Sequence, residues 1–351
     1  MVRRRNAAEA ERDLVRVCHT TADPTPVQDR VLRHLRRLLT ADAAFFATAD
    51  PQTLLFTGAR TEEPLAAATA LFLDNEFRGG DVNAFASLAT APAHVATLDA
   101  ATRNDRYASG RYRDIMRPLG LGDELRAALV VDGHCWGYLC LHRTESPRGF
   151  STREVALLER VGPHIAHALR RSVALGRAEQ AATVHRPGVL LLADDLSVVA
   201  STPEAEQLME LIGKGPTGFP LPAAVCSVAA ALHAVQRGIR LNPSATVRAR
   251  NGQWVSVHAA RLQGPAGPGG ISVVLDPTEA RGTPSVLLGA YALTPRETEV
   301  ATRVLRGEST RTITDALHIS ANTVQDHLKA IFDKTGARSR RELVGLLLAP
   351  R

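Results

Sequence analysis

Polar side chains near the carboxyl end of the chain have the spacing needed to face one direction from a helix. If Val324 points inward and each residue turns the helix by about 100°, an outward arc of polar side chains results. The arc consists of Asn322, Gln325, Asp326, Lys329 and Asp333, with Thr323 at its edge. Such side chains can reach base edges or phosphates, although an ordinary solvated helix face has the same pattern.

Start and stop signals around this arc predict four helices between Tyr291 and Arg351. Thr294, Pro295 and Glu297 form a capping box with proline at the first helical position, which predicts a helix over 295–306 that Gly307 ends. Ser309 can cap a second helix that runs to Leu317.

The third and fourth helices follow directly. Ser320 predicts a helix over 321–335, with Val324, Leu328 and Ile331 as its buried stripe and Gly336 as its stop. A second capping box over 339–342 opens the last helix, which carries Leu343, Leu346 and Leu347 on one side. The second and third helices have the spacing of a helix-turn-helix, whose second member lies in the DNA major groove.

The matching residues resemble the DNA-binding domain of LuxR-type transcription factors, over about 60 of the 351 residues. They are Leu293 to Glu297, Gly307, Ile319, Ser320, Thr323, Val324, His327, Lys334, Gly336, Ser339 and Arg340. The resemblance implies that Gln325, Asp326 and Lys329 read bases. It implies DNA contacts, mainly to phosphates, by Ser309, Thr310, Ser320, Asn322, Thr323 and Lys334. It also places the fourth helix, with Leu343, Leu346 and Leu347, near a dimer interface.

Two of the departures from the family pattern concern the proposed base readers. Many members have Lys where this chain has Gln325, and a small or apolar residue where it has Asp326. Because Gln favours adenine and Asp can accept from cytosine N4, the chain should prefer its own operator sequence. His327 matches the family, but we interpret it as structural because it flanks the core stripe.

Composition agrees with a cytoplasmic DNA-binding protein. The 351 residues carry a net charge of +6, and the segment from Tyr291 onward has ten Lys and Arg against seven Asp and Glu. Double-stranded DNA, RNA polymerase and a second copy of the chain are the expected partners. No apolar run is long enough for a membrane span, and Asn6 to Asp13 is polar where a signal peptide needs an apolar core. Four cysteines in a chain of this length fit a reduced compartment.

An upstream hairpin and a long helix indicate a sensor domain. Apolar runs over 125–131 and 134–142 flank Asp132-Gly133, which favours a type I′ turn, and Ser151 opens a long amphipathic helix. This hairpin and helix resemble those of GAF domains, which implies a pocket for a small molecule or a protein. If strict alternation holds, Trp136, Tyr138 and Cys140 share one face and are candidate pocket residues, although plain core is an alternative.

The same hairpin holds His134, Cys135, Cys140 and His142, which invites a metal site. Alternation turns Cys135 away, and the others would spread over about 27 Å of strand at roughly 3.3 Å per residue, too far for one ion. We therefore predict no metal site and no known cofactor.

Residues 188–277 resemble a PAS-type sensor fold. Strands are expected over 189–193 and 198–201, then helices, then strands over 246–250, 254–261 and 271–275, with a loop over 264–270. A short, proline-rich middle at 215–222 departs from the family pattern and puts a cofactor pocket in doubt.

Other classes fit less well. Asp194 and Asp195 follow a strand as in a phosphorylation-dependent receiver domain, but the Asp and Lys that such a domain needs later are missing. An enzyme would need a phosphate-cradling loop, metal-ligand spacing or a nucleophile elbow, and none occurs. A sigma-like polymerase subunit would need a promoter-melting region before residue 291.

The sequence thus predicts a multidomain α+β protein with no enzymatic activity. We expect a tail or helix over 1–19, GAF-like and PAS-like antiparallel-sheet domains over 20–175 and 182–280, and a linker over 281–290. An all-α, four-helix LuxR-type domain follows over 291–351.

Overall fold

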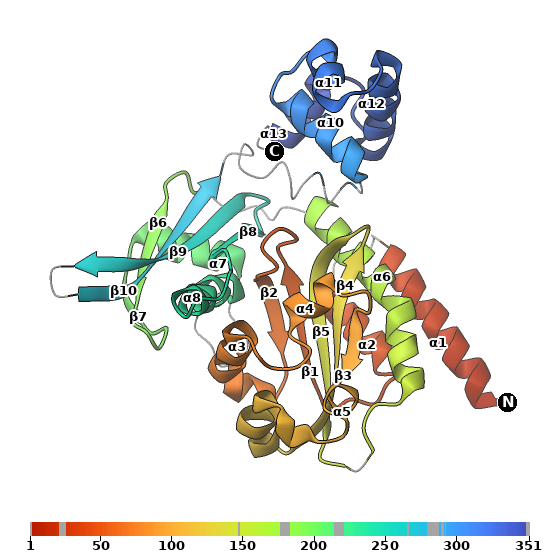
Figure 1. Cartoon of the computed structure of the whole chain (residues 1–351), viewed down its shortest axis with the longest axis vertical. Coiled ribbons are helices and arrows are strands. Elements are labelled where there is room, and N and C mark those ends of the chain that lie inside the picture. The colour runs from red at the N-terminus through yellow and green to blue at the C-terminus, as the bar shows by residue number, and fades with distance from the viewer. Residues whose placement is uncertain are drawn as a thin grey trace.

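The computed structural model contains two antiparallel sheets followed by a group of four helices (Figure 1). It describes residues 2–20, 26–146, 148–175, 183–213, 221–264, 267–278, 288, 291 and 293–348. The predicted α+β multidomain class is confirmed. No helix in these ranges combines the length and apolarity that crossing a bilayer requires.

The first sheet has the strand order β2-β1-β5-β4-β3. Its strands are β1 (Ala43–Ala49), β2 (Phe56–Thr61), β3 (Val95–Thr97), β4 (Leu121–Val131) and β5 (His134–Thr144). One face packs on α1 (Val2–His19), α2 (Val27–Leu35) and α6 (Thr152–Leu175). The other face packs on α3 (Thr69–Arg78) and α4 (Phe85–Thr90). Five short helical segments complete this unit: η1 (Leu65–Ala68), α5 (Leu98–Ala101), η2 (Arg106–Ala108), η3 (Tyr112–Met116) and η4 (Arg117–Leu119).

The predicted hairpin and long helix are both confirmed. Asp132 and Gly133 have φ values of 50° and 76°, the positive pair that a type I′ turn requires. At the start of α6, the hydroxyl and the backbone N–H of Ser151 both donate to Glu154 Oε2, each over 2.8 Å.

A bulge in β5 overturns the predicted alternation along this strand. Leu129 pairs with Gly137 and Val130 pairs with Cys135, so Trp136 is an extra residue without a partner on β4. Trp136 therefore packs on the face covered by α6, whereas Tyr138 and Cys140 pack on the face covered by α3 and α4. The prediction that Trp136, Tyr138 and Cys140 share one face was wrong.

The second sheet repeats the strand order of the first, as β7-β6-β10-β9-β8. Its strands are β6 (Gly188–Leu192), β7 (Val198–Ser201), β8 (Ser244–Arg248), β9 (Trp254–Gly264) and β10 (Gly267–Thr278). The expected loop over 264–270 is mostly strand, because Gly264 pairs with Gly267 and Gln263 with Pro268. The PAS-like resemblance stays a prediction. Of its predicted proline-rich middle over 215–222, residues 215–220 lie outside the described residues.

The antiparallel pairing of this sheet contradicts the receiver alternative. A doubly wound α/β domain of that kind builds a parallel sheet from crossover connections. Here β6 pairs antiparallel with both β7 and β10, and Asp194 lies in the exposed turn between β6 and β7, beside the Arg261 guanidinium.

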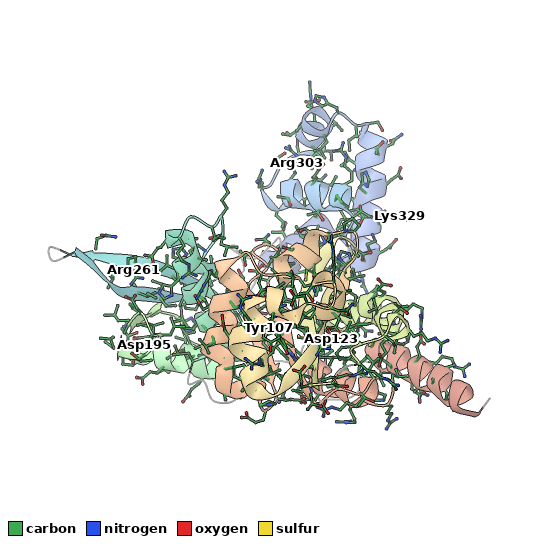
Figure 2. The ribbon with its side chains drawn as sticks, turned by 60° about the horizontal axis from the view of Figure 1, so that its bottom comes forward. Tyr107, Asp123, Asp195, Arg261, Arg303 and Lys329 are labelled. Carbon is green, nitrogen blue, oxygen red and sulfur yellow. The ribbon has the colours of Figure 1, made fainter. Side chains whose placement is uncertain are left out.

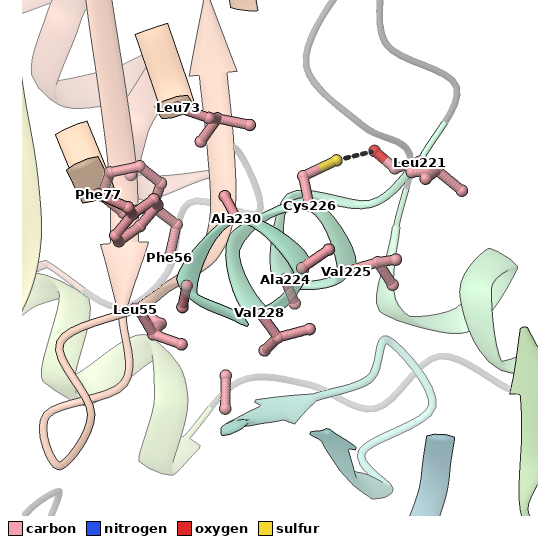
Figure 3. Close-up of a cluster of buried hydrophobic side chains, with 14 of the residues drawn as sticks. Leu55, Phe56, Leu73, Phe77, Leu221, Ala224, Val225, Cys226, Val228 and Ala230 are labelled. Carbon is pink, nitrogen blue, oxygen red and sulfur yellow. Dashed lines mark hydrogen bonds between the residues drawn. The ribbon is translucent and has the colours of Figure 1, made fainter. Parts of the chain in front are cut away.

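Two helices cover the second sheet, and one of them lies between the two sheets. They are α7 (Pro203–Ile212) and α8 (Ala223–Gln236). Nearly every side chain of α8 is buried, as expected for a helix that is apolar all round. It packs on α3 and β2 of the first unit and on β9 of the second. Figure 3 shows Ala230 toward Phe56 and Phe77, the Cys226 thiol toward the Leu221 carbonyl, and Val228 toward the second sheet.

Polar contacts reinforce this packing. The backbone N–H of Phe56 donates to Ser227 Oγ over 2.9 Å, and the backbone N–H of Thr246 donates to Asp50 Oδ2 over 2.8 Å. One hydrophobic cluster continues from the first sheet through α8 into the second. A change in shape at β2 or α3 therefore bears directly on the second unit.

The last four helices form a unit with its own core (Figure 1). They are α10 (Pro295–Leu305), α11 (Thr310–Leu317), α12 (Ala321–Thr335) and α13 (Arg340–Leu348). These bounds agree with the predicted ones to within about one residue, the usual uncertainty of a helix end. The core side chains are Leu288, Leu293, Val300, Ala301, Val304, Ile313, Val324, Leu328, Ile331, Ala337 and Leu343.

Candidate nucleic-acid interface and sensor core

The helix pair α11–α12 begins each of its helices in the same way. Ser309 Oγ accepts the backbone N–H of Thr312, and Ser320 Oγ accepts the backbone N–H of Thr323, each over 3.1 Å. Between the helices, His318 takes the left-handed conformation with φ of 53° and ends α11. The turn over 318–320 thus fixes how α12 leaves α11.

The outward arc predicted for α12 is exposed. Asn322, Gln325, Asp326, Lys329 and Asp333 are all exposed. Val324 and Ile331 are fully buried, Leu328 nearly so, and Thr323 and His327 are half-buried at the boundary. Figure 2 shows Lys329 on the outer side of the helical unit. The arc therefore presents amide, carboxylate and ammonium groups together on one helix face.

Side chains from α10 and α13 hold the first helix of the pair, α11, at its two ends. Arg296 Nη2 of α10 donates to the carbonyl of Leu317, the last residue of α11, over 2.5 Å. From α13, Arg340 donates to the Glu308 carbonyl over 3.2 Å and to Thr310 Oγ1 over 2.9 Å, at the start of α11.

Glu297 anchors the far end of α12 while it caps α10. Its carboxylate accepts the Thr294 backbone N–H over 2.7 Å and pairs with Lys334 Nζ over 2.7 Å. Burial would raise the pKa of Glu297, but these bonds outweigh burial and hold the pKa below its usual value. The predicted capping box is confirmed, and its carboxylate also ties α10 to α12.

Several residues predicted to contact phosphate already have partners within the unit. Ser309 and Ser320 cap helices, Thr310 accepts from Arg340, and Lys334 pairs with Glu297. These side chains position the helices whatever else they bind.

The last helix differs from its predicted role at one residue. Leu343 is 0% exposed in the core of the unit, so the prediction that it forms a dimer surface was wrong. Leu346 is half-buried, and the side chain of Leu347 lies outside the described residues. The predicted box at Ser339 is also incomplete, because Glu342 accepts the N–H of Arg338, over 2.8 Å, instead of that of Ser339.

Aromatic rings fill the space between the first sheet and α3 and α4. The ring centroids of Phe85 and Tyr138 are 4.7 Å apart, and those of Phe45 and Phe72 are 4.9 Å apart. The Tyr138 hydroxyl donates to the Leu54 carbonyl over 3.0 Å. Of the three candidate pocket residues, Tyr138 belongs to this cluster, Cys140 lies beside it among charged groups, and Trp136 is on the opposite face.

A cavity of about 180 Å³ lies beside these rings. Leu55, Phe77 and Phe85 of the first unit line it together with Ile239 and Leu241, which follow α8. Because both units contribute walls, a molecule in this cavity would touch the contact between them.

A buried network of charges lies between the rings and the sheet, and sequence reasoning missed it. Arg111 Nη2 donates to Glu124 Oε2 over 2.7 Å, and Arg126 Nε donates to Glu124 Oε1 over 3.1 Å. Arg126 also pairs with Glu76 over 2.7 Å, and its guanidinium lies 4.1 Å from the Phe85 ring centroid. All four charged side chains are almost completely buried.

These contacts set the ionisation of the network. Burial works against the charge of Glu124, yet Arg111 and Arg126 bring the pKa of this carboxyl far below its ordinary value. Burial lowers the pKa of His142, the neighbour of Glu124 across the strands, to about 4. The sequence signal for the network was Arg126, a charge inside a strand otherwise predicted to be apolar.

The helix pair thus presents an exposed polar face, and a cavity lies between the first sheet unit and the residues that follow α8. Residues 291–347 match the family model described as bacterial regulatory proteins, luxR family, and residues 23–169 match that of the GAF domain. The chain thus carries a LuxR-type DNA-binding domain behind a GAF domain, the architecture of a transcriptional regulator. No curated protein matches its sequence.

Solved structures give weaker likenesses. A phage VqmA in complex with DPO is 18% identical, with a TM-score of 0.23, over 46% of this chain and 79% of that one. The VqmA dimer of Vibrio cholerae is 20% identical, with a TM-score of 0.21, over 46% and 81%. The E. coli DhaR(N)-DhaL complex is 12% identical, with a TM-score of 0.25, over 79% and 89%.

Proposed function

We propose that the chain binds a specific double-stranded DNA sequence by placing the outward arc of α12 in the major groove. Gln325, Asp326 and Lys329 are the base readers in this proposal. The observation that carries it is the exposure of the whole arc on a helix whose C-terminal end is tied to α10 by Lys334 and Glu297, while α10 and α13 hold the preceding helix α11. A preorganised helix loses little conformational freedom when it binds.

Phosphate contacts would come from the starts of the two helices, where backbone N–H groups attract anions, and from Lys334 in the last turn of α12. The proposed set is Ser309, Thr310, Ser320, Asn322, Thr323 and Lys334. Since Lys334 is already paired with Glu297, we expect its replacement to lower stability more than DNA affinity.

The chain would act as a homodimer on a palindrome whose half-sites lie about one helical turn apart. Leu346 on α13 is the remaining described candidate for the dimer contact, with help from α6. The regulator would work in the bacterial cytoplasm, with RNA polymerase as a downstream partner, and it would act by binding without catalysing a reaction.

The sensing half would occupy 20–175 and 182–280, with 281–290 as a linker to the DNA-binding half. We propose that a small, largely apolar molecule enters the cavity beside Phe77 and Phe85. Its effect would pass through α8 and the Phe56–Ser227 hydrogen bond to the second unit.

Replacing Lys329 by Ala tests the reading face. At fixed salt we expect operator affinity to fall about tenfold or more, because a base contact contributes about 1–3 kcal/mol. Arg33→Ala removes the same charge from an exposed position on α2 and should leave affinity unchanged. Wild-type affinity and sequence preference in Lys329→Ala would refute the proposed reading face.

Filling the cavity tests the sensing half. Leu241→Trp should make the DNA affinity of the full chain insensitive to small-molecule extracts that alter the wild type. Val199→Trp, on an exposed position of the same unit, should respond like the wild type. An unchanged response in Leu241→Trp would place the effector site elsewhere.

A further inference from the structure

Three potential metal ligands meet inside the first unit, on the two longest strands of its sheet. They are Glu124 of β4 and Cys140 and His142 of β5, and each is 0% exposed. Cys140 Sγ lies 3.1 Å from Glu124 Oε1 and 3.1 Å from His142 Nε2, and the last two atoms are 3.9 Å apart.

These separations suit one tetrahedral zinc ion. With Zn–S of about 2.3 Å and Zn–N and Zn–O of about 2.0 Å, neighbouring ligand atoms lie roughly 3.3–3.5 Å apart. The observed distances lie on both sides of this range, so shifts of a few tenths of an ångström would complete the site. A thiolate, an imidazole and a carboxylate are all ligands that zinc accepts.

The bulge in β5 is what assembles this group. In a strict hairpin register, Glu124 would lie opposite Leu141, and Cys140 and His142 would face the other way. The extra residue Trp136 shifts the register, so that Glu124 pairs with His142 and all three ligands share one face.

The charged side chains around these three ligands carry more negative than positive charge, and a bound cation would balance the excess. Arg126 has Glu76 as a second partner, and the N–H and guanidinium of Arg111 both face Asp81. Three carboxylates thus surround two guanidinium groups in this network, which leaves one negative charge in excess. Isolated buried charge is costly.

An ion pair network alone does not account for every group present. Arg126 Nη2 and His142 Nδ1 are both buried without a hydrogen-bond partner among the described residues, whereas His142 Nε2 lies 3.1 Å from Cys140 Sγ. Ligation of a metal at Nε2 would fix the remaining ring proton on Nδ1, the nitrogen that makes no hydrogen bond to the described residues.

We propose that Glu124 Oε1, Cys140 Sγ and His142 Nε2 bind one zinc ion in the GAF domain. On binding, Cys140 loses its thiol proton to solvent, and the resulting thiolate together with the excess carboxylate charge balances the two positive charges of the ion. Glu124 Oε2 keeps its bond to Arg111 Nη2, and the ion would share Oε1 with the Nε–H groups of Arg111 and Arg126 that now donate to it, each over 3.1 Å. A tetrahedral shell would also need a fourth ligand, which no other His, Cys, Asp or Glu of the described residues supplies.

Cobalt(II) is a direct probe, because its bond to a thiolate gives a charge-transfer absorption band. We expect the metal-free full chain, without a histidine tag, to bind one Co²⁺ with this band, and Zn²⁺ to displace it. Cys140→Ser should abolish the band, and His142→Gln should weaken binding at least tenfold. The matched controls Cys135→Ser and His134→Gln on the same strand should keep the band and the affinity.

Absence of the band in the wild type, or its persistence in Cys140→Ser, would overturn the proposal. If Cys140→Ser does not fold, X-ray absorption of the zinc-loaded wild type decides. One sulfur and at least two nitrogen or oxygen neighbours support the site, whereas a shell without sulfur overturns it. DNA binding is measured in parallel, so failure of the metal site leaves the proposed reading face separately testable.

Discussion

The C-terminal helices and the first sheet were specified by the sequence in different ways. In α10 to α12, each boundary follows from residues within four positions of it, such as Thr294 with Glu297 and Ser320 with Thr323. In the first sheet, the faces of β5 depend on a single extra residue and on groups that are distant along the chain. Local signals therefore predict a helical unit well, and they predict a sheet only up to its first irregularity.

The largest expected effect comes from the buried charges of the sheet. Replacing Glu124 by Ala leaves Arg111 and Arg126 short of a partner in the core. We expect the free energy of unfolding to fall by about 3–5 kcal/mol, as for one partner lost from a buried ion pair. Urea unfolding followed by tryptophan fluorescence measures it.

Glu159→Ala is the control for this prediction, because Glu159 is exposed on α6. It should change stability by less than about 0.5 kcal/mol. A similarly small change in Glu124→Ala would mean that the network contributes little to the fold.

A pair of glycines sharpens the comparison between the two regions. A Cβ on Gly137, next to the bulge, would lie 2.5 Å from the Ala47 carbonyl oxygen and 2.6 Å from Leu169 Cδ1. We expect Gly137→Ala to destabilise the sheet by about 1–3 kcal/mol through overpacking. Gly345 of α13 has open space around it, so Gly345→Ala should stabilise its helix by about 0.5–1 kcal/mol.

Thermal and urea unfolding of both alanine variants provide the measurement. Equal effects of the two substitutions would contradict the close approach of β5 to β1 and α6 at Gly137.

A smaller effect, dependent on pH, is expected at Glu297. The folded state lowers the pKa of this carboxyl from 4.5, so its ionised form adds stability above that pH. This contribution is lost as pH falls through the folded pKa. Glu297→Gln should therefore cost about 0.5–1 kcal/mol near neutral pH, since Lys334 is partly exposed, and the difference from wild type should vanish in acid. A difference that is constant with pH would show that charge plays no part.

The contrast between the C-terminal helices and the first sheet also explains which parts of the candidate sites could be predicted from the sequence. The exposed arc of α12 follows from helical geometry, because Val324 alone sets the direction of its neighbours. The type I′ turn at Asp132-Gly133 follows from two adjacent residues. Leu343 was misassigned, since a leucine stripe does not reveal whether its partner lies within the unit or in a second copy.

The buried network was missed for a further physical reason. Its members come from three segments that only the folded sheet brings together: Glu76 of α3, Arg111, and the β4 pair Glu124 and Arg126. The pairing of these charges offsets the free-energy cost of burying them, whereas charged residue types taken alone would be expected on the surface. The trio Glu124, Cys140 and His142 likewise depends on the bulge, which no local pattern around Trp136 predicts.

Selection of random DNA duplexes by the purified full chain tests the central claim most directly, with the wild type and the double variant Gln325→Ala/Asp326→Ala compared at the same salt. We predict that the wild type selects a two-fold symmetric motif. The double variant should lose preference at particular base pairs in each half-site while it keeps its affinity for DNA in general. An identical motif of equal strength from both proteins would contradict the assignment of the α12 arc as the reading face.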